Sequence, residues 1–365
     1  GIEIVRNSSA QVGVDSDRDS YSTSQRADYG NTLDGSAISG QSVEDWQWGI
    51  RVSESSTVEL NRNLIENHQR GGVYAQGQSV VKLRGGNIVQ NNTHTESDGR
   101  VRGAGFEVRD STLEMSDWSQ EHEPNTISGN GEYAFRADGG ELHLRGGAIW
   151  EDDVLTSEAN RLVISGHQTG ISASRGSKVT LERVDVQDND KRGIRISENS
   201  VLNVWNGGAT ITDNGLNNDD GDDGYGPGLE IDRNSTASVD RLTVSGNGQG
   251  VYVSQGSTFS GGWDGDASNN DYAIVIKDNK QRGLSVRKNS NIALKKIEIS
   301  GNGATAYVND DNSNFYEEAV QIKDSSTGDM RDGKIVNNRG RALDLRNNSK
   351  FNLRTMTISG NGYVA

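Results

Sequence analysis

The chain has 365 residues and a formal net charge of -15, with 52 acidic against 37 basic side chains. This balance excludes a protein that holds nucleic acid through Lys and Arg, and it equally disfavours binding to an anionic membrane surface. No Cys is present, only 31% of the residues are hydrophobic, and no apolar run approaches the roughly 18 residues of a membrane span, so a disulfide framework, a large globular core and membrane insertion are not expected.

A unit of 21 to 23 residues recurs along the chain and is clearest where residues 283–303 and 342–362 align without a gap. Each unit carries three pairs of apolar residues, and each pair brackets one outward residue. In the first of these two units the pairs are Leu284 and Val286, Ile292 and Leu294, and Ile297 and Ile299. A period of two is typical of strands with one buried face. The sequence therefore predicts three short strands per unit, joined by turns of Gly, Asn, Asp and Ser.

Twelve such units follow one another along the chain. They begin at Gly1, Gly49, Gly72, Gly105, Ala134, Gly170, Gly193, Gly228, Gly250, Gly283, Ala319 and Ala342. In the fifth unit the third strand is left open between residues 146–150 and the segment of Leu162 and Ile164.

Longer segments interrupt the units at only two positions. They lie between the second and third strands, at 13–36, 116–125, 145–160 and 260–272, and before the next unit, at 42–48, 92–104, 215–227 and 303–318. Since equal positions of a stacked repeat share one edge, these insertions are expected to form two ridges, where binding normally resides.

Two polar columns accompany the apolar pattern. An Asn follows the third strand in most units, and the structural column is formed by Asn189, Asn247, Asn302, Asn338 and Asn361, with further members at 67, 91, 130, 214 and 279. A Ser precedes the second strand at 8, 56, 79, 177, 200, 235, 257, 290, 326 and 349. If successive units lie one strand spacing apart, about 4.8 Å, these side chains can hydrogen-bond up and down the stack.

Three short strands in each turn of 21 to 23 residues resemble the right-handed parallel β-helix, the pectate-lyase-like superfold. The resemblance covers the whole chain and implies an all-β solenoid of about twelve coils with three short strands each, in a single domain spanning residues 1–365. Known members include polysaccharide lyases, hydrolases, epimerases, phage tailspikes and non-catalytic adhesins, so the resemblance leaves the function open.

Three Asp-rich segments suggest calcium, a hard ion that prefers several oxygen ligands. Their carboxylates belong to Asp15, Asp17 and Asp19, to Asp219, Asp220, Asp222 and Asp223, and to Asp264 and Asp266. The group at 219–223 is the first candidate, because four carboxylates lie within five residues. The alternative is that these segments are solvated acidic loops.

Tryptophan gives a second candidate site, because exposed aromatic faces stack on sugar rings. Most of the six lie in or beside insertions or directly after strands: Trp46, Trp48, Trp118, Trp150, Trp205 and Trp263. They are candidate ligand-binding residues for a polysaccharide or cell-surface glycan. The alternative is that they cover neighbouring coils and hold the insertions in place.

No catalytic signature stands out. Polygalacturonase-like proteins would show Gly-His-Gly, whereas this chain has Gly166-His167-Gln168, and the Asp-Pro-His of alginate epimerases is absent. Acidic pairs such as Glu317 and Glu318 carry little information in a chain with 52 acids. Outward strand residues such as Arg51, Arg195 and Lys295 could act as a base, but they could equally solvate a sheet. The catalytic residues therefore stay unknown.

The sequence predicts a secreted or cell-surface β-helix that serves as a structural or adhesive stalk, fibre or filament segment and binds polysaccharide along its insertions. The alternative is a polysaccharide lyase, epimerase or hydrolase, or a tailspike depolymerase. Neither end carries a capping segment, which leaves two expectations open: a fragment of a longer protein, or self-association end to end.

Overall fold

The structure is a computed structural model that describes residues 1–13, 32–34, 48–115, 125–147, 149–151, 154–157, 161–216, 225–262, 272–304, 306–308 and 314–362. These residues form strands, turns and bends, and no helix occurs among them. They group into two compact units, unit 1 with residues 1–173 and 177–185, and unit 2 with residues 174–176 and 186–365. The predicted all-β architecture is confirmed.

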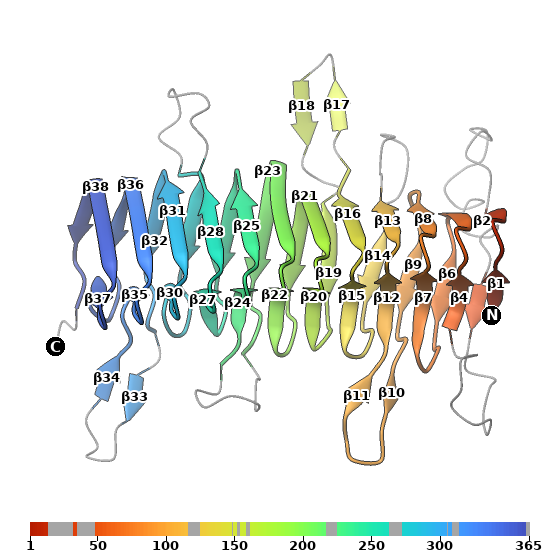
Figure 1. The fold of residues 1–365 in the computed structure, drawn as a ribbon, viewed down its shortest axis with the longest axis horizontal. Helices are drawn as coiled ribbons and strands as arrows, with labels where there is room; N and C mark the ends of the chain where they lie inside the picture. The colour runs from red at the N-terminus through yellow and green to blue at the C-terminus, as the bar shows by residue number, and fades with distance from the viewer. Residues whose placement is uncertain are drawn as a thin grey trace. The chain divides into compact units, whose positions relative to one another are not determined.

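In unit 1 each coil contributes three strands, and strands of the same kind pair in parallel from coil to coil (Figure 1). The first strands are β1 (Ile2–Ile4), β4 (Trp48–Val52), β7 (Gly71–Gln76), β12 (Ala104–Arg109), β15 (Tyr133–Asp138) and β20 (Thr169–Ser174). The second strands are β2 (Ser9–Gly13), β5 (Thr57–Asn61), β8 (Val80–Leu83), β13 (Thr112–Met115) and β16 (Glu141–Arg145). The third strands are β3 (Thr32–Asp34), β6 (Leu64–Glu66), β9 (Ile88–Gln90), β14 (Thr126–Ser128) and β19 (Leu162–Ser165), while β21 (Lys178–Gln187) combines a second and a third strand.

Unit 2 repeats this plan by itself. Its first strands are β22 (Arg192–Ile196), β24 (Pro227–Ile231), β27 (Gln249–Val253), β30 (Leu284–Val286), β35 (Val320–Ile322) and β37 (Leu343–Leu345). The others are β23 (Val201–Thr212), β25 (Thr236–Val239), β26 (Leu242–Ser245), β28 (Thr258–Gly261), β29 (Ile274–Lys277), β31 (Asn291–Lys295), β32 (Ile297–Ser300), β36 (Thr327–Val336) and β38 (Lys350–Ser359).

Among the described residues, three antiparallel hairpins lie inside predicted insertions: β10 (His94–Thr95) with β11 (Val101–Arg102), β17 (Ile149–Glu151) with β18 (Val154–Ser157), and β33 (Ala306–Val308) with β34 (Asn314–Tyr316). In unit 1 the two hairpins leave opposite edges of the coils (Figure 1), as the two insertion positions predict. Since β19 pairs with β14, the third strand of this coil is the segment of Leu162 and Ile164, and residues 149–151 belong to a hairpin instead.

The core consists of the inward residues of all three strands, stacked coil on coil. Phe106 and Phe135 are fully buried, occupy paired positions on β12 and β15, and stack with their ring centres 5.1 Å apart. Because every coil buries the same few positions, a lean hydrophobic composition is sufficient for this fold.

The predicted polar columns form continuous hydrogen-bond ladders. In unit 2 the side-chain amide of Asn189 donates to Asn214 at 2.8 Å, and the same contact continues through five further residues, Asn247, Asn279, Asn302, Asn338 and Asn361. A Ser ladder, in which the backbone N–H of one Ser donates to the hydroxyl of the next, runs from Ser200 to Ser349.

In unit 1 Asn130 takes its predicted place in the Asn column, but the column differs from the prediction by one residue at Asn67 and Asn91. Asn92 and Asn130 are joined by an amide contact of 2.8 Å, and the backbone N–H of His68 donates to Asn92. Asn67 and Asn91 instead take the preceding turn position, with φ of 61° and 54°. That position needs a left-handed backbone, which Asn tolerates, so an Asn-Asn or Asn-His pair can be placed in either frame from the sequence alone.

Candidate functional site

A cleft of about 390 Å³ lies in unit 1 between the hairpin β10–β11 and the outer face of the first strands. Its lining is rich in charge: Gln69, Arg70, His94, Glu96, Arg102, Gly103, Glu107, Arg109, Glu132, Tyr133 and Arg136. Four Arg and three Glu side chains gather there, whereas the chain as a whole has an excess of acids. The cleft is therefore a local concentration of guanidinium groups.

The first strands place part of this lining by their register. Arg51, Tyr74, Glu107 and Arg136 are paired positions on β4, β7, β12 and β15. All four alternate with inward core residues, so their side chains leave the same face of the sheet. A column of charged and aromatic groups follows, one from each coil.

The hairpin supplies the other wall. Its turn is closed by the backbone bond from Glu96 N–H to the carbonyl of Arg100 at 2.8 Å, and Gly99 takes a φ of 85°. Gly accepts this left-handed backbone without a steric cost. The hairpin therefore holds Glu96 and Arg102 at the edge of the cleft.

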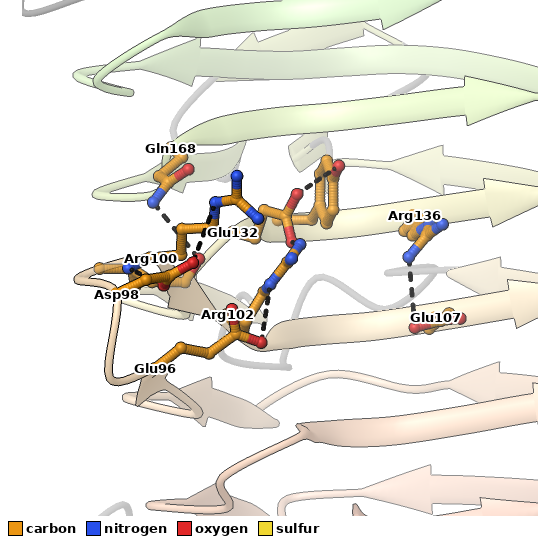
Figure 2. Close-up of polar contacts among 10 residues, drawn as sticks. Glu96, Asp98, Arg100, Arg102, Glu107, Glu132, Arg136 and Gln168 are labelled. Carbon is orange, nitrogen blue, oxygen red and sulfur yellow. Dashed lines mark hydrogen bonds and ion pairs between the residues drawn. The ribbon is translucent and has the colours of Figure 1, made fainter. Parts of the chain in front are cut away.

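Arg102 ties the hairpin to the first strands (Figure 2). Its guanidinium lies 3.3 Å from Glu96 and 3.1 Å from Glu132, and the Tyr133 hydroxyl donates to Glu132 at 2.8 Å. The hydrogen bond with Glu132 raises the pKa of Arg102. On the same side, the Gln168 amide donates to the carbonyl of Val101 at 3.4 Å.

Glu107 is the buried anion of the cleft. Its carboxylate lies 2.6 Å from Arg109 and 4.0 Å from Arg136, and its side chain is 9% exposed while both arginines are 38% exposed. Burial opposes the charged form of Arg109, but the charge and hydrogen bond of Glu107, together with Tyr74 and Asp138, outweigh burial and raise the pKa of Arg109. The cations consequently cover the acid and form the outer surface.

Each of these two arginines also lies over a tyrosine ring. The guanidinium carbon of Arg109 is 5.6 Å from the ring centre of Tyr74, and that of Arg136 is 5.6 Å from the ring centre of Tyr133. Burial raises the pKa of the Tyr74 phenol. Stacking and ion pairing together restrict the rotamers of both arginines, which prepares their remaining N–H groups for a ligand.

Two of the tryptophans chosen from the sequence, Trp48 and Trp205, have described side chains, and neither lines this cleft. Trp48 is only 5% exposed and stacks on Tyr74 with ring centres 5.1 Å apart, so its face is not open to a sugar and the covering role applies. Trp205, in β23 of unit 2, is 50% exposed. Trp150 belongs to β17, but its side chain is outside the described part, as are the residues Trp46, Trp118 and Trp263. Tryptophan is absent from the described lining of the cleft.

The calcium candidates fall outside the described ranges. This applies to Asp15, Asp17 and Asp19, to Asp219, Asp220, Asp222 and Asp223, and to Asp264 and Asp266. Within the described ranges no group of three or more His, Asp or Glu side chains has the arrangement of a metal site. The calcium site stays a prediction.

Outward charged residues named from the sequence are present but belong to ion pairs or to other surfaces. Arg51 lies 3.7 Å from Glu3, and Arg195 lies 3.4 Å from Asp232. Lys295 lines a second cleft in unit 2, of about 310 Å³. The residues that build the cleft of unit 1 were missed, because alternation marks Glu107 and Arg136 as outward but does not show that the coils bring them together.

The structure contains no helix long and apolar enough to span a membrane, within the residues it describes.

Residues 48–263 and 227–365 match the family model described as a right-handed β-helix region. No curated protein matches the chain. Among solved structures, the A-module of the mannuronan C-5 epimerase AlgE4 of Azotobacter vinelandii is similar at 11% identity and a TM-score of 0.26, covering 87% of this chain and 90% of that one. A likeness at this level does not carry over an activity.

Proposed function

The chain belongs to the right-handed β-helix family, and from this premise we propose that it is an extracellular or cell-surface structural or adhesive protein that binds an acidic polysaccharide. The proposed binding site is the cleft between the hairpin β10–β11 and the first strands of unit 1. The ligand would be a chain of sugars that carry carboxylate groups.

One observation carries this proposal, namely that a buried acid lies beneath two partly exposed arginines in a protein of net charge -15. Glu107 is nearly enclosed, while Arg109 and Arg136 present their guanidinium groups outward. A guanidinium has five N–H donors in a planar fork, so an ion pair with one carboxylate leaves donors for another. An arriving sugar carboxylate would meet cations that are already positioned.

Other residues that line the cleft could contact the uncharged part of a sugar. Tyr133 lines the cleft beside Arg136, and Gln69 and His94 supply further polar groups at the wall. Such a site needs no turnover, which agrees with a structural or adhesive protein.

The test is a calorimetric titration of an oligogalacturonate into the wild-type protein and two variants. Arg136→Gln removes one outward guanidinium of the cleft and is expected to weaken binding by about tenfold, the worth of a charge-assisted hydrogen bond. Arg145→Gln is the matched control, because Arg145 pairs with Glu182 at 3.1 Å on the second strands of the same unit. The control is expected to bind within about twofold of wild type.

Equal losses in both variants, or no binding by the wild type, would contradict the proposal. The same solutions are followed for unsaturated products and new reducing ends. Turnover of the oligogalacturonate would replace the binding role by that of a polysaccharide-active enzyme.

A further inference from the structure

Unit 2 carries a row of three cations on adjacent coils. Arg287, Lys323 and Arg346 each directly follow a first strand, β30, β35 and β37, which are neighbours in the sheet (Figure 1). The preceding residues of these strands are paired in register, and the backbone N–H groups of Lys323 and Arg346 donate to the coil before at 2.9 and 3.0 Å. The three side chains therefore leave one face at intervals of one strand spacing, about 4.8 Å.

Such a row is costly by itself, because like charges directly opposite on neighbouring strands repel each other. Burial lowers the pKa of Lys323, and the positive charges of Arg287, Arg282 and Arg346 lower it further. Within the described part of the chain Lys323 makes no ion pair. Asp324, the next residue, is the acid that acts against the shift.

The acids of this surface lie beneath the cations. Glu317, Glu318 and Asp344 are all buried, whereas the Arg346 side chain is 54% exposed. The buried acids are held by Arg282, 2.6 Å from Glu317, and by Arg346, 2.7 Å from Asp344. Arg287, Lys323 and Arg346 thus meet solvent along the row, and Asp324 is the partly buried acid beside Lys323.

Both arginines of the row are held in place. Arg287 donates to the Ser285 hydroxyl at 2.9 Å, and its guanidinium carbon lies 5.6 Å from the ring centre of Tyr252. Arg346 is fixed by its contact with Asp344. Lys323, between them, is the cation left without a carboxylate partner in the described structure.

We propose that Arg287, Lys323 and Arg346 form a second binding site, which takes a linear polysaccharide with one carboxylate or sulfate group for each coil. The bound anions would relieve the repulsion along the row, and the repeat of the coils would set the spacing that the polymer must match. The site is built from unit 2 alone and does not depend on the cleft of unit 1. A nucleic acid is a poorer match, because the rest of this acidic chain repels it.

The test measures the rate at which an amine-selective acylating reagent modifies Lys323, followed by peptide mass spectrometry. The protein used carries Arg136→Gln, which weakens the proposed site in unit 1. The result at Lys323 therefore does not depend on whether that site binds the probe. Oligogalacturonate and a heparin oligosaccharide are the two probes, which separate carboxylate from sulfate recognition. Lys350, an exposed lysine on β38 of the same unit, is the internal control.

At a probe concentration about ten times Kd, the Lys323 rate is expected to fall about tenfold with at least one of the two probes, while the Lys350 rate stays unchanged. Adding Arg346→Gln is expected to remove most of this protection. An unchanged Lys323 rate with both probes would overturn the proposal. Equal protection of Lys350, or equal protection by neutral dextran or by duplex DNA, would overturn it as well.

Discussion

At the scale of single residues, the outer face of the first strands combines enclosed carboxylates with covering guanidinium groups. Unit 2 repeats the arrangement seen in unit 1: Asp232 is buried directly after β24, two residues beyond Glu230, and its carboxylate lies 3.4 Å from Arg195. Burying a carboxylate is costly unless it is paired. Pairing with the arginines therefore offsets the cost of enclosing these carboxylates.

The buried position of Asp232 leads to a prediction about pH. Burial, together with the charge of Glu230, raises the pKa of Asp232 above its ordinary value of 3.8. The folded protein consequently holds this proton more tightly than the unfolded chain, so the contribution of Asp232 to stability is greatest below pH 3.8 and is lost as the pH rises through the folded pKa. Asp232→Asn removes this loss.

The prediction for Asp232 is checked by urea unfolding of the wild-type protein and of Asp232→Asn from pH 3 to neutral pH. The free energy of unfolding of the variant, relative to wild type, is expected to increase with pH across that window. A relative stability that stays constant or decreases would show that the pairing with Arg195 and Arg233 outweighs burial.

At the scale of elements, the turn ladders hold each coil to the next. Asn302 is fully buried, its amide donates to Asn338 and to the carbonyl of Ile276, and it accepts the amide of Asn279 at 2.8 Å. Every member satisfies the backbone groups of a turn that would otherwise be unpaired. The ladder therefore fixes the register of the strands on either side.

Removing one member should be costly in the middle of a ladder. Asn302→Ala leaves buried polar groups on two neighbouring coils without partners and is expected to lower the free energy of unfolding by about 3 kcal/mol. Asn361→Ala is the matched control, because Asn361 is only partly buried, and a loss of about 1 kcal/mol is expected there. Equal losses, measured by urea unfolding, would mean that the ladder does not act through burial.

Much of the pattern of strands and turn ladders could be predicted from the sequence, because stacking imposes the same residue at the same position in coil after coil. The Asn and Ser columns and the three strands per coil follow directly from that repetition. The hairpin β10–β11 could not be predicted, since its strands have two residues each and show no periodicity. The burial of Glu107 was equally hidden, because it depends on Arg109 and on Arg136 of the next coil.

At the scale of the whole molecule, the net charge of -15 does not describe the outer face of the first strands, where both proposed binding sites lie. The first-strand face of each unit, taken separately, presents arginines or lysines above buried acids. A strongly acidic chain can thus bind an acidic polymer locally while the rest of its surface limits non-specific association. The proposed role in binding acidic polysaccharide follows from this contrast.

The most direct test compares an oligogalacturonate with its carboxyl-reduced, neutral form, titrated by calorimetry into the wild-type protein at low and at physiological salt. The two ligands share length, linkage and hydroxyl groups and differ in charge. The account predicts that reduction weakens binding by about tenfold or more and that added salt weakens only the binding of the charged form. Equal affinity for both forms, or binding that does not respond to salt, would contradict it.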